Sequence, residues 1–385
     1  MIRLLGGSLW ASKAVRLALF CASVSLGVAA LSPIAQAQPI LILCSDDLAP
    51  QNFSCGTAAS SNGGSSTAVG DAAAGFGTGT SAFGTNAGAL FDFGTAIGNN
   101  ATAGGLAGNA STAIGASSAA GVFLQSGTFH FSAGATAVGA NAHAGAAADG
   151  QTNATAVGGN AFANALNATA VGAEAQANFS NATALAQAAQ ANAVNATAVG
   201  QGALANHGNG TAIGQGAQVG GSNSTAVGQG ATANNINGVA LGQNTHADFD
   251  DASALGQRSN ATNVGATVVG AASLASGQFS TTVGSFANAG GAAGNDGTTA
   301  IGGHAQAGTG TGQTNATAVG DSAHANAAGG TAVGQNAQAN GGSATAVGQN
   351  ARANASGASA FGQGAVAAGQ FSTASGFGSQ AGGFG

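Results

Sequence analysis

The sequence of 385 residues lacks most of the side chains on which ordinary globular domains depend. It has no Tyr, one Trp, three Pro and five Lys or Arg, and charged residues make up 4% of it. So few cations cannot form the basic patch that nucleic-acid binding requires. Low charge with 44% hydrophobic residues also argues against a solvated disordered chain. With 69 Gly, the chain is expected to pack through small side chains.

Catalytic motifs are missing as well. The sequence contains no Ser/His/Asp arrangement within a motif and no paired carboxylates on a cleft-forming element, and its Gly-rich turns recur too often to indicate a phosphate loop. We therefore expect a protein that is not an enzyme and that binds no cofactor.

The first 37 residues have the pattern of a signal peptide. Arg3, Lys13 and Arg16 precede or open an apolar run over 17–31, and Ala35-Gln36-Ala37 offers a cleavage site. Export to an oxidising compartment allows a disulfide between Cys44 and Cys55 in an N-terminal segment over 38–65; two free thiols are the alternative.

One motif recurs over residues 66–385. A branched or aromatic residue stands before Gly in phrases such as NATAVGQGALA, from Asn195 to Ala205, and marks the anchor of each repeat. The anchors are Val69, Phe83, Ile97, Ile114, Val138, Val157, Val171, Leu185, Val199, Ile213, Val227, Leu241, Leu255, Val269, Val283, Ile301, Val319, Val333, Val347 and Phe361, with Ser375 in the same place. Fifteen of the twenty intervals are 14 residues, which is the signature of a repeat protein.

A helical interpretation of this period fails. Gly follows nearly every anchor and recurs in the next turn, and each Gly inside a helix would destabilise it by about 1 kcal/mol relative to Ala. The charged positions that flank the apolar seam of a coiled coil are also missing. Each repeat instead divides into two short extended pieces, such as 196–199 and 203–205, separated by Gly, Gln and Asn turns. The sequence therefore predicts an all-β solenoid, a flattened coil with two short strands in each lap.

Alternation within a strand separates two faces of each lap. Thr197 and Val199 share one side of the first strand, whereas Ala196 and Ala198 share the other. We expect the anchors to form the core of the roll, in particular Val157, Val171, Val199, Ile213, Val227, Leu241, Leu255, Val269, Val283, Val333 and Val347. The Ala face would then be exposed along the rod, so we infer its burial against a symmetry mate.

Single laps cannot be stable. Ordering one residue costs on the order of 1–2 kcal/mol, whereas one buried Val or Ile returns roughly 1.5–3 kcal/mol. Stacking on neighbouring laps must supply the rest, as in other repeat proteins. At about 4.8 Å per strand, the stack would be a rod of roughly 100 Å. In the second strand the middle residue varies from Phe162 to Arg352, which predicts a solvent-facing column.

The repeat T-A-[VI]-G-x-x-A-x-A resembles the head domain of trimeric autotransporter adhesins, the YadA-like heads. Phrases such as GQFSTTVGSFANA from Gly277 and GQFSTASGFGSQA from Gly369 are similar to that family's head repeats. The resemblance implies a left-handed parallel β-roll, a homotrimer, and display on the surface of a Gram-negative bacterium as a virulence-associated adhesin. Family members continue through a stalk to an outer-membrane anchor. No heptads follow the repeats here, so we expect either a fragment of a longer adhesin, which we favour, or an unanchored copy, with membrane attachment only through an anchor that this chain lacks.

Extra residues enter at five intervals, of 17, 24, 19, 18 and 18 residues. Loops on a rigid scaffold often carry binding residues. The longest insertion, between Ile114 and Val138, supplies the candidate ligand-binding loop, Phe123, Leu124, Phe129, His130 and Phe131. Such an aromatic cluster could anchor a partner; the alternative is an extra hairpin that packs on the roll.

Other polar residues favour structural roles. His143, His246 and His324 share the variable column but have no ligand-like spacing, so no metal site is expected. The Asp cluster at Asp248, Asp250 and Asp251 is interpreted as a surface loop. N-x-[ST] triplets occur at Asn153, Asn167, Asn181, Asn195, Asn260 and Asn315, and a stacked Asn ladder explains them better than glycosylation.

The leading functional hypothesis is an exported adhesin head. Many repeated weak contacts, multiplied by trimerisation, would bind matrix proteins, cell surfaces or abiotic surfaces through avidity. One alternative is ice binding by an in-register Thr ladder, which includes Thr155, Thr169 and Thr197. A silk-like structural β-solenoid is another.

Overall fold

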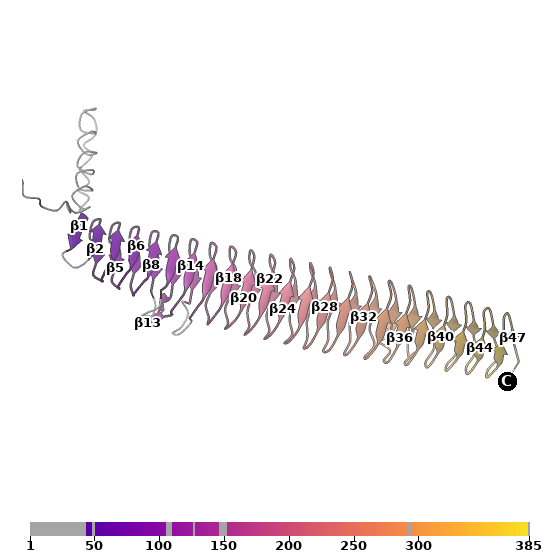
Figure 1. The fold of residues 1–385 in the computed structure, drawn as a ribbon. Coiled ribbons are helices and arrows are strands. Elements are labelled where there is room, and N and C mark those ends of the chain that lie inside the picture. The colour runs from indigo at the N-terminus through magenta and orange to yellow at the C-terminus, as the bar shows by residue number, and fades with distance from the viewer. Residues whose placement is uncertain are drawn as a thin grey trace, which may run out of the picture.

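The computed structural model describes residues 44–47, 51–104, 110–125, 128–145, 152–291 and 294–383, and for 45–47 and 123–131 only the backbone. The signal segment expected over residues 1–37 lies outside this range. The described chain forms a straight, narrow rod of stacked laps (Figure 1). Each lap contributes one strand to each of two sheets, which we call sheet A and sheet B.

Sheet A has 23 strands, and all but the first two repeat the motif's first strand. They are β1 (Cys44–Asp47), β2 (Asn52–Cys55), β4 (Thr67–Val69), β6 (Ser81–Phe83), β8 (Thr95–Ile97), β10 (Thr112–Ile114), β14 (Thr136–Val138), β16 (Thr155–Val157), β18 (Thr169–Val171), β20 (Thr183–Leu185), β22 (Thr197–Val199), β24 (Thr211–Ile213), β26 (Thr225–Val227), β28 (Val239–Leu241), β30 (Ser253–Leu255), β32 (Thr267–Val269), β34 (Thr281–Val283), β36 (Thr299–Ile301), β38 (Thr317–Val319), β40 (Thr331–Val333), β42 (Thr345–Val347), β44 (Ser359–Phe361) and β46 (Thr373–Ser375).

Sheet B holds the second strand of each lap. Its strands are β3 (Ser60–Ser61), β5 (Ala74–Gly75), β7 (Gly88–Ala89), β9 (Thr102–Ala103), β11 (Ala119–Ala120), β15 (His143–Ala144), β17 (Phe162–Ala163), β19 (Gln176–Ala177), β21 (Gln190–Ala191), β23 (Leu204–Ala205), β25 (Gln218–Val219), β27 (Thr232–Ala233), β29 (His246–Ala247), β31 (Asn260–Ala261), β33 (Leu274–Ala275), β35 (Asn288–Ala289), β37 (Gln306–Ala307), β39 (His324–Ala325), β41 (Gln338–Ala339), β43 (Arg352–Ala353), β45 (Val366–Ala367) and β47 (Gln380–Ala381).

Strands of successive laps pair in parallel and without slippage. Thr197 of β22 lies opposite Thr211 of β24, and Val199 lies opposite Ile213. In sheet B, Leu204 lies opposite Gln218 in the same manner. The predicted all-β solenoid with two strands per lap is therefore confirmed, and its strands are parallel.

Two turns close each lap, and they differ. The first turn, from sheet A to sheet B, always has four residues, as in 200–203. Its opening Gly200 has φ +132°, and a Cβ there would lie 2.5 Å from the carbonyl oxygen of Gly214 one lap on. Gly suits this close approach of successive backbones, and it occupies the position in every described lap but one, where Ala186 has φ +105°. The second turn, from sheet B to the next sheet A strand, normally has five residues, as in 206–210.

The space between the two sheets is filled by small side chains. Ala196, Ala198, Ala203 and Ala205 are all fully buried, and the same four positions are Ala, Ser, Thr, Val or Gly in the other laps from Ser66 onward. At two places a larger residue faces a Gly. Val219 faces Gly210, where a Cβ would lie 2.8 Å from a Val219 methyl. Gly75 likewise faces Thr80, with 2.9 Å from the would-be Cβ to the Thr hydroxyl. Volume is conserved because the short turns hold the sheets at a set distance.

The expectation that the anchors form the core of the roll is wrong for the single chain. All eleven lie on the outer face of sheet A, partly or fully exposed: Val157, Val171, Val199, Ile213, Val227, Leu241, Leu255, Val269, Val283, Val333 and Val347. Ala196 and Ala198, expected on the exposed face, point inward. The physical reason is space, because an interior bounded by four-residue turns admits Ala from both sheets but not a column of Val and Ile.

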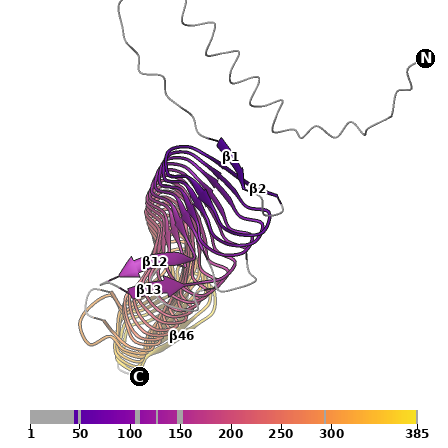
Figure 2. The same ribbon diagram turned by 90° about the vertical axis from the view of Figure 1, so that its left-hand side faces the viewer.

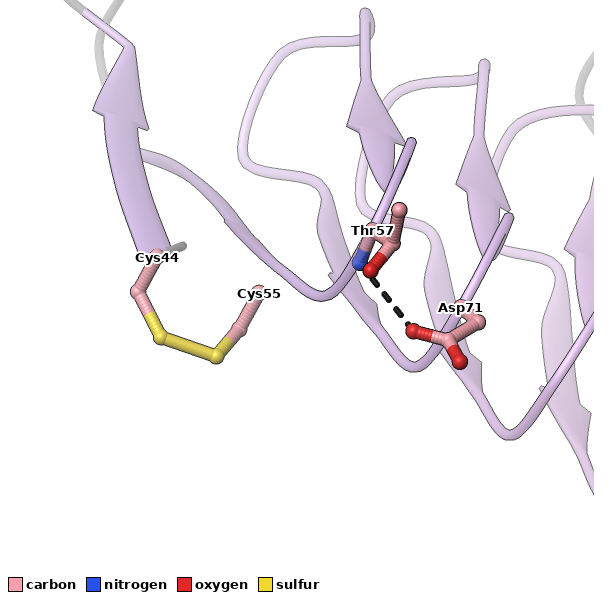
Figure 3. Close-up of a disulfide and its surroundings, with 4 residues drawn as sticks. All are labelled: Cys44, Cys55, Thr57 and Asp71. Carbon is pink, nitrogen blue, oxygen red and sulfur yellow. Dashed lines mark hydrogen bonds between the residues drawn. A yellow bond between two sulfur atoms is a disulfide. The ribbon is translucent and has the colours of Figure 1, made fainter. Parts of the chain in front are cut away.

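The N-terminal end of the stack is covered by a strand of different direction. β1 pairs antiparallel with β2, whereas β2 pairs in parallel with β4. Cys44 and Cys55 are joined by a disulfide across this pair (Figure 3). The Asp71 carboxylate accepts a hydrogen bond from the Thr57 N–H over 3.1 Å and links the first laps. Of the two alternatives for these cysteines, the structure contains the disulfide.

Candidate interaction surfaces

The outer face of sheet A presents two continuous rows of side chains. One row is Thr in most laps and the other consists of the anchors, because both positions point outward from the same strand. Ten anchors are exposed by more than a third of their surface: Phe83, Ile97, Ile114, Val171, Ile213, Val269, Val283, Ile301, Val347 and Phe361. Soluble monomers rarely expose an apolar stripe of this length, so it marks a contact surface.

The outer face of sheet B carries the variable column, as predicted. Each middle residue is partly or fully exposed, including Phe162, Leu204 and Arg352. His143 stacks on Phe162, with ring centroids 5.1 Å apart. Burial of this imidazole lowers the pKa of His143 below its ordinary value, because desolvation disfavours the charged form.

Side-chain amides form ladders along both edges of the coil. In the second turn, each Asn side chain donates to the next through Asn153, Asn167, Asn181, Asn195, Asn209 and Asn223, over 3.0–3.3 Å. The predicted Asn ladder is thus confirmed for the first four of its residues. Asn260 instead lies in β31. Asn315 lies opposite Gly297 of the preceding lap, which has no side-chain amide. Gln residues of the first turn form a similar ladder from Gln187 to Gln257.

Each carboxylate of the acidic cluster accepts a hydrogen bond from the preceding lap. Asp248 accepts from Asn234 over 2.8 Å and Asp251 accepts from Asn237 over 2.9 Å. Asp250 accepts the backbone N–H of Ile236 over 3.0 Å. A carboxylate can receive such a bond but cannot donate the next one. The cluster is a surface turn, as interpreted from the sequence.

The histidines of the variable column lie in separate laps. His246 is bonded to the Thr232 hydroxyl, with 2.6 Å between Nδ1 and Oγ1, and His324 lies in β39. No group of three or more His, Cys, Asp or Glu in the described ranges could hold a metal ion. Within those ranges no helix has the length and apolar character to cross a membrane.

The candidate ligand-binding loop folds as a hairpin. β12 (Val122–Gln125) pairs antiparallel with β13 (Thr128–Phe131), which places Phe123 opposite His130 and Leu124 opposite Phe129. Seen along the rod, the hairpin lies beside the stacked laps (Figure 2). The side chains of residues 123–131 lie outside the described part, so the aromatic cluster stays a prediction.

The sequence pattern did not predict the large apolar residues on the second-turn edge as contact residues. Phe93, Phe279 and Phe371 stand where other laps have the ladder Asn, and they are 57–68% exposed. The sequence does contain a signal for them. Each Phe stands at the Asn position of the 14-residue repeat, and the residue 14 positions before it is Gly.

The family model for the YadA head domain repeat (2 copies) matches residues 77–101, 150–175, 163–185, 191–217, 205–231, 220–245, 233–259, 313–337, 327–351, 339–365 and 353–379, together just over half of the sequence. No curated protein matches it.

Proposed function

Since the chain belongs to the family of YadA head domain repeats, a group of surface adhesins, we propose that it is the exported head of a homotrimeric adhesin. The head attaches a bacterium to matrix protein, cells or abiotic surfaces through multivalent, non-catalytic contacts. The signal segment over 1–37 directs export, residues 38–65 begin the folded head, and residues 66–385 form the repeat rod on the outer surface of the cell.

The outer face of sheet A is the trimer interface. The stripe of exposed anchors is the observation that carries this assignment, because it runs through β4 to β44 without a covering element in the described chain. Each Val or Ile removed from water contributes about 25 cal/mol per Å² of apolar area. Twenty such laps in each of three chains would hold a stable trimer, and the Thr row beside the anchors would supply hydroxyls at its margin.

The interface therefore differs from the one first inferred. The Ala face is already buried between sheets A and B of one chain and is not available to a symmetry mate. The anchors, which have no place inside the lap, take that role. The hairpin with Phe123, Leu124, Phe129, His130 and Phe131 remains the proposed ligand-binding loop, because it is the longest of the five insertions into the stack.

Sedimentation of the exported chain tests the trimer. The wild type should sediment with three times the chain mass, whereas replacing Ile213, Val227 and Leu241 by Asp should yield monomers whose circular dichroism still shows β-structure. Sedimentation of the wild type as a folded monomer contradicts the proposal. If that monomer also produced thermal hysteresis, the Thr row would be an ice-binding face.

A further inference from the structure

Exposed apolar residues are distributed unevenly between the two edges of the rod. Apart from the sheet A anchors, eleven large apolar side chains of the described residues are exposed, and nine of these lie in second turns: Phe76, Phe93, Leu166, Phe179, Val194, Ile236, Phe249, Phe279 and Phe371. The other two, Phe286 and Phe377, lie on the first-turn edge. Packing within one chain does not explain this difference, because none of the nine is buried between the sheets.

All changes in lap length occur on the same edge. The five long intervals insert their extra residues between a sheet B strand and the next sheet A strand, and the hairpin β12–β13 is one of them. Every first turn keeps four residues. Variation confined to one edge of a regular scaffold is typical of a binding surface.

Three phenylalanines of this edge keep an unfavourable backbone conformation without being buried. Phe93, Phe279 and Phe371 have φ of +57°, +55° and +54°. Left-handed conformations are uncommon for bulky residues, and Asn, the residue of the other laps, adopts them more readily. The turn imposes a positive φ at this position in other laps too, as at Asn195 and Ser343, so it is the choice of a bulky residue that distinguishes the three Phe laps.

Glycine in the preceding lap holds each ring against the edge. A Cβ on Gly265 would lie 2.7 Å from Cδ1 of Phe279, and on Gly357 it would lie 2.6 Å from Cδ1 of Phe371. For Gly79 and Phe93 the distance is 3.0 Å. The same arrangement of a Gly below a Phe ring thus occurs three times, and it leaves more than half of each Phe exposed.

The charge of this edge is of one sign. Asp92, Asp248, Asp250, Asp251 and Asp296 lie in second turns, and none forms an ion pair in the described chain. Arg258 lies in a first turn and Arg352 in sheet B, so the described second turns contain no Lys or Arg. Cationic groups would be attracted both by the carboxylates and by the faces of the Phe rings.

We propose that the second-turn edge binds an extended polypeptide that carries basic and apolar side chains. Phe93, Phe279 and Phe371 are its contact residues. Phe279 and Phe371 are six laps apart, about 29 Å at 4.8 Å per lap, so the partner runs along the rod. This inference rests on the proposed adhesin function and names the partner class. A neutral polysaccharide fits less well, because the Asn amides that could bind hydroxyls are bonded to one another.

Binding of the exported full chain to four immobilised surfaces tests the inference. The surfaces are a Lys-Leu-Lys-Ser repeat peptide, the Glu-Leu-Glu-Ser and Lys-Ser-Lys-Ser peptides of equal length, and a neutral β-glucan. The wild type should bind the first peptide at least tenfold more tightly than the other three surfaces, and salt should weaken this binding. Preference for the glucan, or no binding to any surface, overturns the inference.

Asparagine substitutions supply a matched pair of variants. A triple variant combines Phe93→Asn, Phe279→Asn and Phe371→Asn, which place the ladder residue at these positions. Its melting temperature should be no lower than that of the wild type, while its affinity for the peptide should fall at least tenfold. Phe286→Asn makes the same change on the first-turn edge, also at positive φ, and should alter binding less than twofold. Equal binding by the triple variant contradicts the edge assignment.

Attachment assays separate this inference from the proposed function. Particles coated with the triple variant that still attach to protein-coated surfaces, with peptide binding intact, overturn the edge assignment and leave the adhesin function standing. A wild-type chain that is monomeric and does not attach overturns the proposed function itself.

Discussion

The two edges of the rod are built by the same chain but obey different constraints. In the first turn, backbone follows backbone so closely that Gly200 has no room for a Cβ beneath Gly214, and the length never varies. In the second turn, Asn, Asp, Phe and Gly share one position, and five laps take extra residues. One edge therefore sets the geometry of the stack, while the other is free to acquire contacts.

Insertions should distinguish the edges most clearly. Four residues, Gly-Ser-Gly-Ser, placed after His207 in a second turn should lower the free energy of unfolding by less than about 1 kcal/mol, since loop closure depends weakly on length. The same insertion after Gln201 in a first turn should cost more than about 3 kcal/mol, because it interrupts the Gly stack and the Gln ladder. Urea denaturation of both variants measures this difference. Equal costs would remove the distinction.

Adding one methyl group to the first turn should have the next largest effect. Gly200→Ala should destabilise the rod by about 2–4 kcal/mol, because strain at φ +132° adds to a contact of 2.5 Å with Gly214. Gly216→Ala is the control, since its φ is +64° and a Cβ there meets nothing within 4 Å. Its cost should be about 1 kcal/mol. Thermal unfolding of the pair measures both.

Interior volume should couple two residues of neighbouring laps. Gly210→Ala should cost about 1–3 kcal/mol, because its Cβ would meet a Val219 methyl at 2.8 Å. Val219→Ala returns the usual Ala and should remove most of that cost, giving a favourable coupling energy in a double-mutant cycle. Additive effects of the two substitutions would show that the sheets can separate locally.

The smallest expected effect is a pH dependence at His143. Burial lowers its pKa, so the unfolded chain binds the proton first as pH falls below the ordinary value of about 6.5. Stability of the laps around His143 should therefore be complete above that pH and decrease below it. Hydrogen exchange of β15 and β17 at pH 7.5 and pH 5 would detect the change. His143→Gln introduces the residue that later laps have in this position, as at Gln176 and Gln190, and it should abolish the change.

Much of the fold follows from local sequence because every lap contacts only its neighbours. The 14-residue spacing predicted the laps and their two strands, and the repeated Asn predicted the ladder from Asn153 to Asn195. The variable residues of the second strand indicated an outward column. Candidate contacts were located less well, because Phe279 and Phe371 look like ordinary turn variation until their exposure and positive φ are known.

The sequence by itself determined the period, the strand pairs and the register, since a 14-residue repeat stacked on itself admits one alignment of Thr on Thr and Val on Val. Which side of each strand faces inward was decided by the tertiary structure. Both sides are small or apolar, so alternation alone does not distinguish Ala198 from Val199. The four-residue turn brings the sheets together, and only a face that is Ala on both strands fits between them. Closure of the lap therefore turned the larger side chains outward, where they are available to other chains.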